Sequence, residues 1–385
     1  MANAAMREFG FGTGVFTFGR GALAAAGVLL ALAGNAAAQG DLFSNGSNVP
    51  GDIGLATGTM SVSGVAAPGG FAWSEAPSFG TVEANAVLGF AGRMTSDNAG
   101  FRFADDFDVS ASVFAWSVSE IKFYVYQPGA ASAAAFGAAN LRIWTGLPEA
   151  PGSNLVFGDT TTARPITVTA TTIYRVASTV AILNTPAPSA PDTTRRVYEV
   201  TVQLSPPVTL RTGHYWLDWQ ISPSALDADV FAPPVTALGQ RARAAGSTPN
   251  ALQMKIAVSP TVALAWVPLI DEGKPGSAPD VAQDLPFILR GTTVALPCSP
   301  ADMADDAGNP LPSPGPNNGV NEGDYNAFFN TFFVNQAVGS PADIADDAGV
   351  ALPPFDAGGM GGNSNSGVNE GDYNCFFNYF FLGCG

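Results

Sequence analysis

Histidine and cysteine are scarce in this chain, and acidic residues far outnumber basic ones. One histidine, His214, and three cysteines occur in 385 residues, and the formal net charge is −16. So negative a chain is not expected to bind nucleic acid or an anionic membrane surface. A Ser-His triad would have to use His214, and no G-x-S-x-G or H-E-x-x-H motif occurs. The sequence therefore gives no support for the hydrolases that these motifs mark, and we expect His214 to be a surface or packing residue.

Long apolar runs are also absent. The run at residues 21–34 follows Arg7 and Arg20, and the small residues Ala36 and Ala38 come directly after it. This pattern is typical of a signal peptide, and the run is too short to span a bilayer. We expect residues 1–38 to be removed by cleavage near Ala38. The mature chain is then expected to be secreted, in the extracellular space or at the cell surface, with no transmembrane anchor.

Residues 71–292 carry the pattern of a β domain. Short runs rich in Val, Ile, Thr, Tyr and Trp alternate there with Gly, Pro, Asn and Asp. Residues 39–70 indicate an irregular segment or an edge strand. The alternation predicts a mainly β fold, an antiparallel, jelly-roll-like β-sandwich, with an open barrel as the alternative. The expected strands are residues 112–127, 140–146, 171–178, 195–205, 213–222 and 285–292.

Alternation is clearest at residues 197–204. The two sets of alternating side chains should point to opposite faces of this strand, with the second set facing the core. The first set is Val197, Glu199, Thr201 and Gln203, and the second is Tyr198, Val200, Val202 and Leu204.

Residues 293–385 differ in composition and contain an internal repeat. They hold no Lys, Arg or His but 11 acidic residues. The string PADMADDAG at residues 300–308 returns as PADIADDAG at residues 341–349, and GVNEGDYN at residues 319–326 returns at residues 367–374. The two units therefore share their ends and differ in their middles. This predicts a duplicated C-terminal module with a boundary near residue 293.

The shared ends combine oxygen ligands with a helix. Asp and Asn oxygens are what calcium prefers, and a cation would relieve the repulsion among unpaired carboxylates. After each NEGD, aromatic residues recur at spacings of three and four, which predicts two short helices packed against each other. The aromatic residues are Tyr325, Phe328, Phe329, Phe332 and Phe333 in the first unit and Tyr373, Phe376, Phe377, Phe380 and Phe381 in the second.

These units resemble the dockerin domain, and the flanking LPCSPAD and LGCG are similar to the GC-type dockerin of secreted planctomycete-like proteins. The resemblance covers about residues 296–385. It implies two Ca²⁺ sites and a cohesin-like or cell-surface protein partner. The implied ligands are Asp302, Asp306, Asn321 and Asp324 in the first site and Asp343, Asp347, Asn369 and Asp372 in the second.

Two departures from the dockerin pattern concern the loops themselves. The third ligand position falls on Ala304 and Ala345, which carry no side-chain oxygen, and each loop contains an insert. The expected substitutes at the third position are Asp305, Asp346, Asn317 or Asn365.

The three cysteines all lie in this module. Cys298 precedes the first unit and Cys384 follows the second, so a disulfide between them would tie the ends together, stabilising the fold by roughly 4 kcal/mol in the chain-entropy model. Cys375 is then a buried free thiol, or else the partner of one of the other two.

The β domain carries acidic and aromatic side chains that could form a polysaccharide site. A glycosidase needs two carboxylates at one cleft. Tryptophans could stack on sugars, although we expect at least four of the six to fill the core. Trp216 and Trp219 should lie on opposite faces of one strand, so one of them is expected to be exposed. The candidate carboxylates are Asp105, Asp106, Glu120, Glu199, Asp218 and Asp271, and the tryptophans are Trp73, Trp116, Trp144, Trp216, Trp219 and Trp266.

The whole β segment also looks like a recurrent extracellular bacterial β-sandwich module of unassigned function. We therefore expect a secreted, non-catalytic protein whose calcium-binding module anchors a β-sandwich to a protein partner or the cell surface. The alternatives are a carbohydrate-binding or polysaccharide-degrading protein delivered by the same module, and a structural surface or matrix protein.

Overall fold

The structure is a computed structural model, and its N-terminal 38 residues, the predicted signal peptide, lie outside the described part. No helix in the described part is long and apolar enough to cross a membrane. The described residues are 39–46, 54–76, 78–79, 83–92, 100–110, 114–130, 132–180, 190–223, 230–238, 241, 248–255, 265–313, 315–352, 355 and 364–384.

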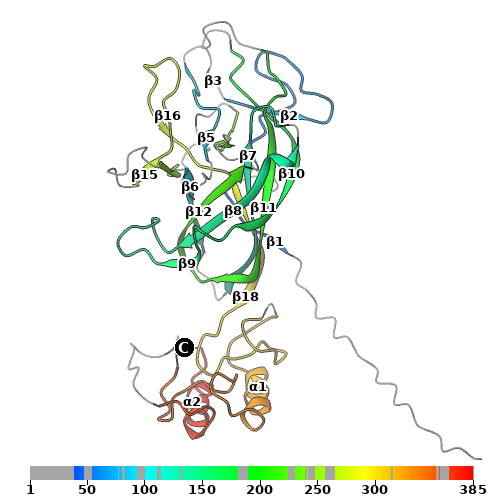
Figure 1. Cartoon of the computed structure of the whole chain (residues 1–385). Helices are drawn as coiled ribbons and strands as arrows, with labels where there is room; N and C mark the ends of the chain where they lie inside the picture. The colour runs from blue at the N-terminus through cyan, green and yellow to red at the C-terminus, as the bar shows by residue number, and fades with distance from the viewer. Residues whose placement is uncertain are drawn as a thin grey trace, which may run out of the picture. The chain divides into compact units, whose positions relative to one another are not determined.

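The described residues form a mainly β structure with two α-helices (Figure 1). We call residues 39–295 the β part and residues 296–384 the tail. The strands are β1 Gly40–Ser44, β2 Ala72–Glu75, β3 Ser78–Phe79, β4 Glu83–Ala84, β5 Phe90–Ala91, β6 Arg102–Val109, β7 Phe114–Tyr126, β8 Phe136–Trp144, β9 Leu155–Gly158, β10 Arg164–Val176, β11 Arg196–Leu210, β12 Gly213–Pro223, β13 Phe231–Ala232, β14 Leu252–Lys255, β15 Ala265–Pro268, β16 Ile270–Asp271, β17 Val281–Ala282 and β18 Phe287–Ala295. The helices are the 3₁₀ turn η1 Ala133–Ala135, α1 Glu322–Phe332 and α2 Glu370–Phe380.

The main sheet runs in the order β1-β18-β7-β11-β10-β8-β12-β6-β14-β15. Its pairings are antiparallel among the described strands, apart from β2, which runs parallel to β10. β1 pairs with β18 at one end of this order, and it lies within the segment predicted as irregular or as an edge strand. The antiparallel, mainly β prediction is confirmed.

Strands that are distant in this order share one apolar core. The ring of Phe123 on β7 stacks 5.8 Å from the ring of Trp219 on β12, and Phe107 on β6 contacts Phe287 on β18 at 6.2 Å. Apolar side chains of β7, β11 and β18 therefore pack against those of β6, β8 and β12. Burial of this common core is the main source of stability for the β part.

The alternation predicted for residues 197–204 is confirmed. One set enters the large core, namely Tyr198, Val200, Val202 and Leu204. On the other face, Val197 packs with Leu55 and Ile173 in a smaller cluster, and Glu199 binds Lys122. All six expected strands are present, with ends shifted by up to seven residues. β18 continues to Ala295, just past the predicted boundary near 293, and the domain division stays a prediction.

The prediction that either Trp216 or Trp219 is exposed is wrong. The two rings do lie on opposite faces of β12, with Trp219 in the large core. Trp216 packs instead with Trp144 and Ala104 in a second cluster, under Leu252 and Trp266. Four of the six tryptophans are buried, as predicted: Trp73, Trp144, Trp216 and Trp219. Because these four rings are buried, they are not accessible for stacking on sugars.

Candidate binding site in the C-terminal tail

Each tail helix begins in a capping box. Asn321 is the N-cap of α1, and its side-chain oxygen accepts a hydrogen bond from Gly323 N at 2.7 Å. The Asp324 carboxylate accepts in return from Asn321 N at 2.8 Å. In α2, Asn369 and Asp372 make the same pair of bonds. These bonds satisfy backbone donors that a helix start otherwise leaves without partners.

The capping carboxylates also hold the distant end of each unit. Asp324 Oδ1 accepts from Met303 N at 2.7 Å and Ala304 N at 2.8 Å. Asp372 Oδ1 accepts from Ile344 N and Ala345 N at the same two distances. Each carboxylate thus joins the start of its unit to the helix at its end, and we call this arrangement the carboxylate latch. Burial raises the pKa of both side chains, although the backbone donors act in the opposite direction.

Steric crowding explains why glycine occupies the third position of the NEGD motif. A side chain at Gly323 would clash with the carbonyl oxygen of Asp305, and one at Gly371 would clash with that of Asp346. The close approach of the loop to the helix start therefore requires glycine at this position.

The first predicted ligands of each loop, Asp302 and Asp343, are nearly buried. Asp302 accepts from Cys298 N at 2.7 Å and from the Asn317 side chain at 3.0 Å. Asp343 Oδ2 accepts from Gly339 N at 2.5 Å and from Asn365 at 3.2 Å. Burial raises the pKa of Asp302.

Asp306 and Asp347 are the exposed members of the predicted ligand sets. Asp306 accepts hydrogen bonds from Asn318 and from the side chain of Asn321 at 2.8 Å. Asp347 accepts from two serines and from Asn369, and these hydrogen bonds lower its pKa to about 2. The amide ends of both asparagines therefore point their donors, not their oxygens, at the carboxylates.

Asp305, one of the predicted substitutes at the third position, organises a turn. Its carboxylate accepts from Ala307 N, from the backbone and side chain of Asn309, and from Ser313 Oγ. In the second unit Asp346 accepts from Ala348 N and Val350 N. The other two substitutes, Asn317 and Asn365, donate to Asp302 and Asp343.

These contacts fit a hydrogen-bonded loop better than a calcium cage, which takes six to eight oxygens. Every side-chain oxygen of the eight predicted ligands accepts a hydrogen bond, except Asp343 Oδ1. Within the described residues, no three of the predicted carboxylates bring oxygens within 4.8 Å of one another. Calcium binding stays a prediction, and the latch gives these residues a role that needs no metal.

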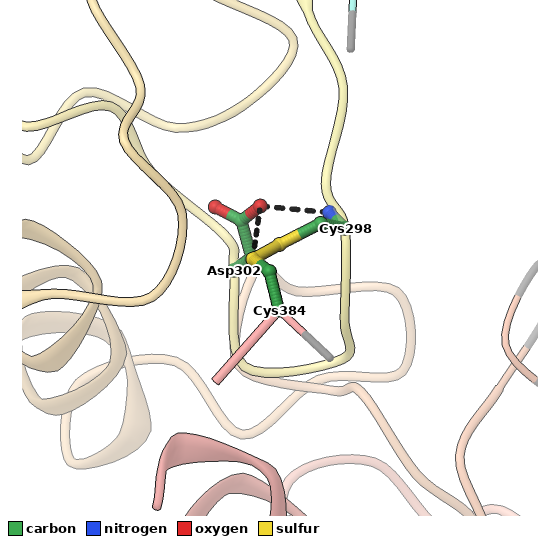
Figure 2. Close-up of side chains that lie close together, drawn as sticks. All are labelled: Cys298, Asp302 and Cys384. Atoms are coloured by element: carbon green, nitrogen blue, oxygen red, sulfur yellow. Dashed lines mark hydrogen bonds between the residues drawn. A yellow bond between two sulfur atoms is a disulfide. The ribbon is translucent and has the colours of Figure 1, made fainter. Parts of the chain in front are cut away.

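Cys298 and Cys384 form a disulfide in the structure, with their Cα atoms 5.5 Å apart. Figure 2 shows the Asp302 carboxylate beside this disulfide, bonded to Cys298 N and 3.8 Å from Cys384 Sγ. The sulfurs are bonded to each other, so this group is a clasp and not a thiolate metal site. Cys375 is a buried free thiol, and burial raises its pKa to about 11.

The two helices pack antiparallel through their aromatic side chains. Phe328 and Phe376 stack at their crossing, with ring centroids 4.1 Å apart. Tyr325 at the start of α1 contacts Phe380 at the end of α2, at 5.9 Å. The symmetry-related contact joins Phe332 and Tyr373 at the same distance. The predicted packing of the two helices is confirmed.

A second set of rings remains at the surface. On α1 the contacts run from Tyr325 to Phe329 and on to Phe333, and on α2 the same contacts recur. Phe329 and Phe377 join the two rows at 6.0 Å. We call these six residues the aromatic face: Tyr325, Phe329, Phe333, Tyr373, Phe377 and Phe381. Phe333 is 71% exposed and Phe381 80% exposed.

In the β part, the candidate carboxylates are partners of structural groups. Asp105 lies in β6, is fully buried and accepts from Asn45 and from Leu285 N. Burial and the nearby Asp284 charge raise its pKa well above the usual range. Asp106 receives a hydrogen bond from Asn250. The exposed His214 contacts Asp108 at 2.8 Å, in line with the prediction of a surface residue.

The remaining candidates are also held by neighbours. Glu120 and Glu199 pair with Arg290 and Lys122, and Asp271 accepts from Ala86 N and Gly273 N. Asp218 binds two arginines and a tryptophan, a network that no sequence motif announced: Arg102, Arg142 and Trp144. Each of these carboxylates therefore has a hydrogen-bond or ion-pair partner within the β part.

Comparison with family models, with curated proteins and with solved structures finds no match for the chain. The case for a function therefore rests on the geometry of the tail.

Proposed function

We propose that the tail is a protein-docking module that attaches the β part, a jelly-roll-like β-sandwich, to a basic protein partner at the cell surface. The aromatic face is the observation that carries this proposal. Its rings continue the apolar packing of the helices outward, with no further layer over them in the described part of the chain. Exposed aromatic clusters of this kind are typical of binding surfaces, where Tyr and Phe supply much of the affinity.

Sequence duplication places the same surface on both helices. Phe333 and Phe381 occupy equivalent positions, each followed by an apolar residue, Val334 or Leu382, that is more than 70% exposed. A soluble module that exposes four such side chains at two equivalent helix ends has a surface suited to burial against another protein.

Charge favours a basic partner over a second copy of this chain. Residues 296–385 contain 11 acidic residues and no Lys, Arg or His. Two such tails would repel each other, whereas basic side chains around an apolar strip would be attracted. We therefore commit to a protein partner with apolar side chains flanked by Lys or Arg.

Fixed loops support such a surface. The carboxylate latches and the Cys298–Cys384 disulfide hold both helices by their starts and by the ends of the module. A surface that is rigid before binding loses less entropy when the partner arrives.

Site-specific photo-crosslinking tests the proposal. A benzoylphenylalanine is placed at Phe333 in one variant and at Val350, an exposed residue outside the aromatic face, in another. Each variant is irradiated with the cell envelope of the producing organism. A single basic protein cross-linked from Phe333 and not from Val350 supports the proposal. Cross-links to a second copy of the chain alone, or no difference between the positions, would reject it.

A further inference from the structure

A cavity of about 340 Å³ lies between the first ends of the two tail units. Equivalent residues of the repeat line it in pairs: Asp302 with Asp343, Met303 with Ile344, and Leu311 with Leu352. The cavity is at the small end of ligand pockets, roughly 300–1,000 Å³. Its walls are apolar, and its polar groups are few.

Two of those polar groups lack hydrogen-bond partners. Asp343 Oδ1 and Ser299 Oγ both belong to residues that line the cavity, and neither has a partner in the described structure. Ser299 is 4% exposed and Asp343 9% exposed. A buried polar atom without a hydrogen-bond partner is unfavourable, so both atoms are available to a ligand that enters the cavity.

The tail has no basic residue of its own that could pair with the Asp343 carboxylate, so a cationic donor from outside the tail suits this oxygen best. Calcium is a poorer match for the unpartnered atoms of this cavity. Asp343 and Ser299 offer it two unpartnered side-chain oxygens, and both oxygens of Asp302 are already bonded, whereas Ca²⁺ takes six to eight oxygen ligands in all.

From the cavity, its apolar walls and its two unpartnered oxygens, we propose that this pocket binds the side chain of a lysine from a protein partner. The four-carbon stem packs between Met303 and Ile344, and the ammonium donates to Asp343 Oδ1 and Ser299 Oγ. A lysine fits better than an arginine because Asp343 presents one free oxygen. A guanidinium binds best to two oxygens of one carboxylate, whereas an ammonium is a point charge with three donors.

The inference rests on the proposed function in one respect: the bound lysine is assumed to belong to a protein partner. The pocket residues are not members of the aromatic face, so small-molecule binding to the pocket is measured separately from docking. Failure of one therefore leaves the other intact.

Methyl-resolved NMR of the full chain without its predicted signal peptide tests the pocket. The Met303 and Ile344 methyl groups are followed while Nα-acetyl-lysine methylamide is added. We expect saturable shifts of both methyl signals. The norleucine analogue, which has the stem without the charge, should bind about tenfold more weakly or worse, as should Asp343→Asn with the lysine probe. The arginine analogue should bind more weakly than lysine.

Glu370→Gln is the matched control, because Glu370 lies in the same unit and is exposed at the start of α2. It should bind the lysine probe as the wild type does. If Asp343→Asn disturbs the loop, Ser299→Ala removes the other unpartnered oxygen and should weaken lysine binding severalfold. Cadaverine, a free diamine, is compared with the lysine probe to distinguish a small-molecule amine from the lysine side chain of a protein as the ligand.

Four results would overturn the proposal: no saturable shift, equal binding of lysine and norleucine, no effect of either pocket variant, or tighter binding of cadaverine than of the lysine probe.

Discussion

Phe328 and Phe376 stack across the tail with ring centroids 4.1 Å apart and planes inclined by 10°. Both rings are fully buried, and they occupy the same position in the two copies of the repeat. The pair joins the two units at the crossing of α1 and α2, where each helix covers the apolar side that the other could not leave in water.

Truncation of this pair should unfold the tail. We expect Phe328→Ala to destabilise it by about 3–5 kcal/mol, because a fully buried ring is replaced by a cavity. Phe333→Ala, at the C-cap of α1, is the control, and it should change the stability by less than about 0.5 kcal/mol because the ring is exposed. A large effect at Phe333 and none at Phe328 would contradict the helix packing described here.

The chain provides a separate reporter for each part. Cys375 is the free thiol left once Cys298 and Cys384 are joined, and it is buried in the tail. Its labelling by 4,4′-dithiodipyridine along a urea gradient reports unfolding of the tail. All six tryptophans precede residue 267, so their fluorescence reports the β part alone.

Loss of a carboxylate latch should also destabilise the tail. Asp324→Ala leaves Met303 N, Ala304 N and Asn321 N without their acceptor, and we expect a cost of about 3 kcal/mol by thiol labelling. Glu322→Ala removes an exposed carboxylate from the same helical turn and should cost less than about 0.5 kcal/mol. Equal effects of the two substitutions would indicate that only the charge near the helix start matters.

The pH dependence of the tail should carry the signature of Asp302. Because burial raises the pKa of this side chain above 3.8, folding favours its protonated form. Its contribution to stability is fully present below the unfolded pKa and is lost as the pH rises through the raised folded pKa. The stability of the wild type minus that of Asp302→Asn should therefore fall as the pH rises above the unfolded pKa of about 3.9. A rise in the stability of the wild type relative to the variant, measured by thiol labelling, would contradict a pKa of Asp302 that burial raises.

Calcium should have little effect on the stability of the tail if hydrogen bonds close the loops. A ligand present at 100 times its dissociation constant stabilises a fold by about 2.7 kcal/mol. If hydrogen bonds alone close the loops, the thiol-labelling midpoint is the same in excess Ca²⁺ and in EDTA. A shift of that size toward stability in Ca²⁺ would instead establish the sites that the dockerin resemblance implies.

In the β part, Asp218 should contribute strongly to the stability of the fold, although no sequence motif marks it. It is fully buried and accepts hydrogen bonds from Arg142 at 2.8 Å and Trp144 at 2.7 Å, as well as from Arg102. Asp218→Ala removes the carboxylate that binds both buried guanidinium groups and leaves Arg142 with only the more exposed Glu149, which should cost about 3–5 kcal/mol by tryptophan fluorescence. Asp108→Ala, at an exposed position of β6, should cost little, and comparable losses would show that the network contributes nothing special.

The sequence predicted what depends on local pattern. Aromatic residues spaced by three and four place Phe328 and Phe376 on one side of each helix, and alternation along residues 197–204 separates the two faces of β11. The capping boxes were also readable, because an asparagine three residues before an aspartate is a helix-start signature. The same asparagines and aspartates were predicted to be calcium ligands, since side-chain oxygens in such loops can either bind calcium or cap a helix.

Features made by distant segments could not be predicted in this way. Strand β6 was not predicted, because its acidic residues are typical of loops. The partners that allow Asp105 to be buried there lie 60 and 180 residues away in the sequence. Trp216 is covered by Trp144 and Trp266 from other strands. The pocket at Asp343 and Ser299 exists only once the two units have come together, so no spacing within one unit indicates it.

The most direct test of the docking proposal is a binding isotherm of the full chain on the cell envelope of its producing organism. The Phe333→Asp/Phe381→Asp double variant is compared with the wild type and with Val350→Asp, which adds a charge at an exposed site outside the aromatic face. We expect the double variant to bind at least about tenfold more weakly, with Val350→Asp unchanged. Equal binding by all three proteins, with the tail folded in each by thiol labelling, would contradict the account.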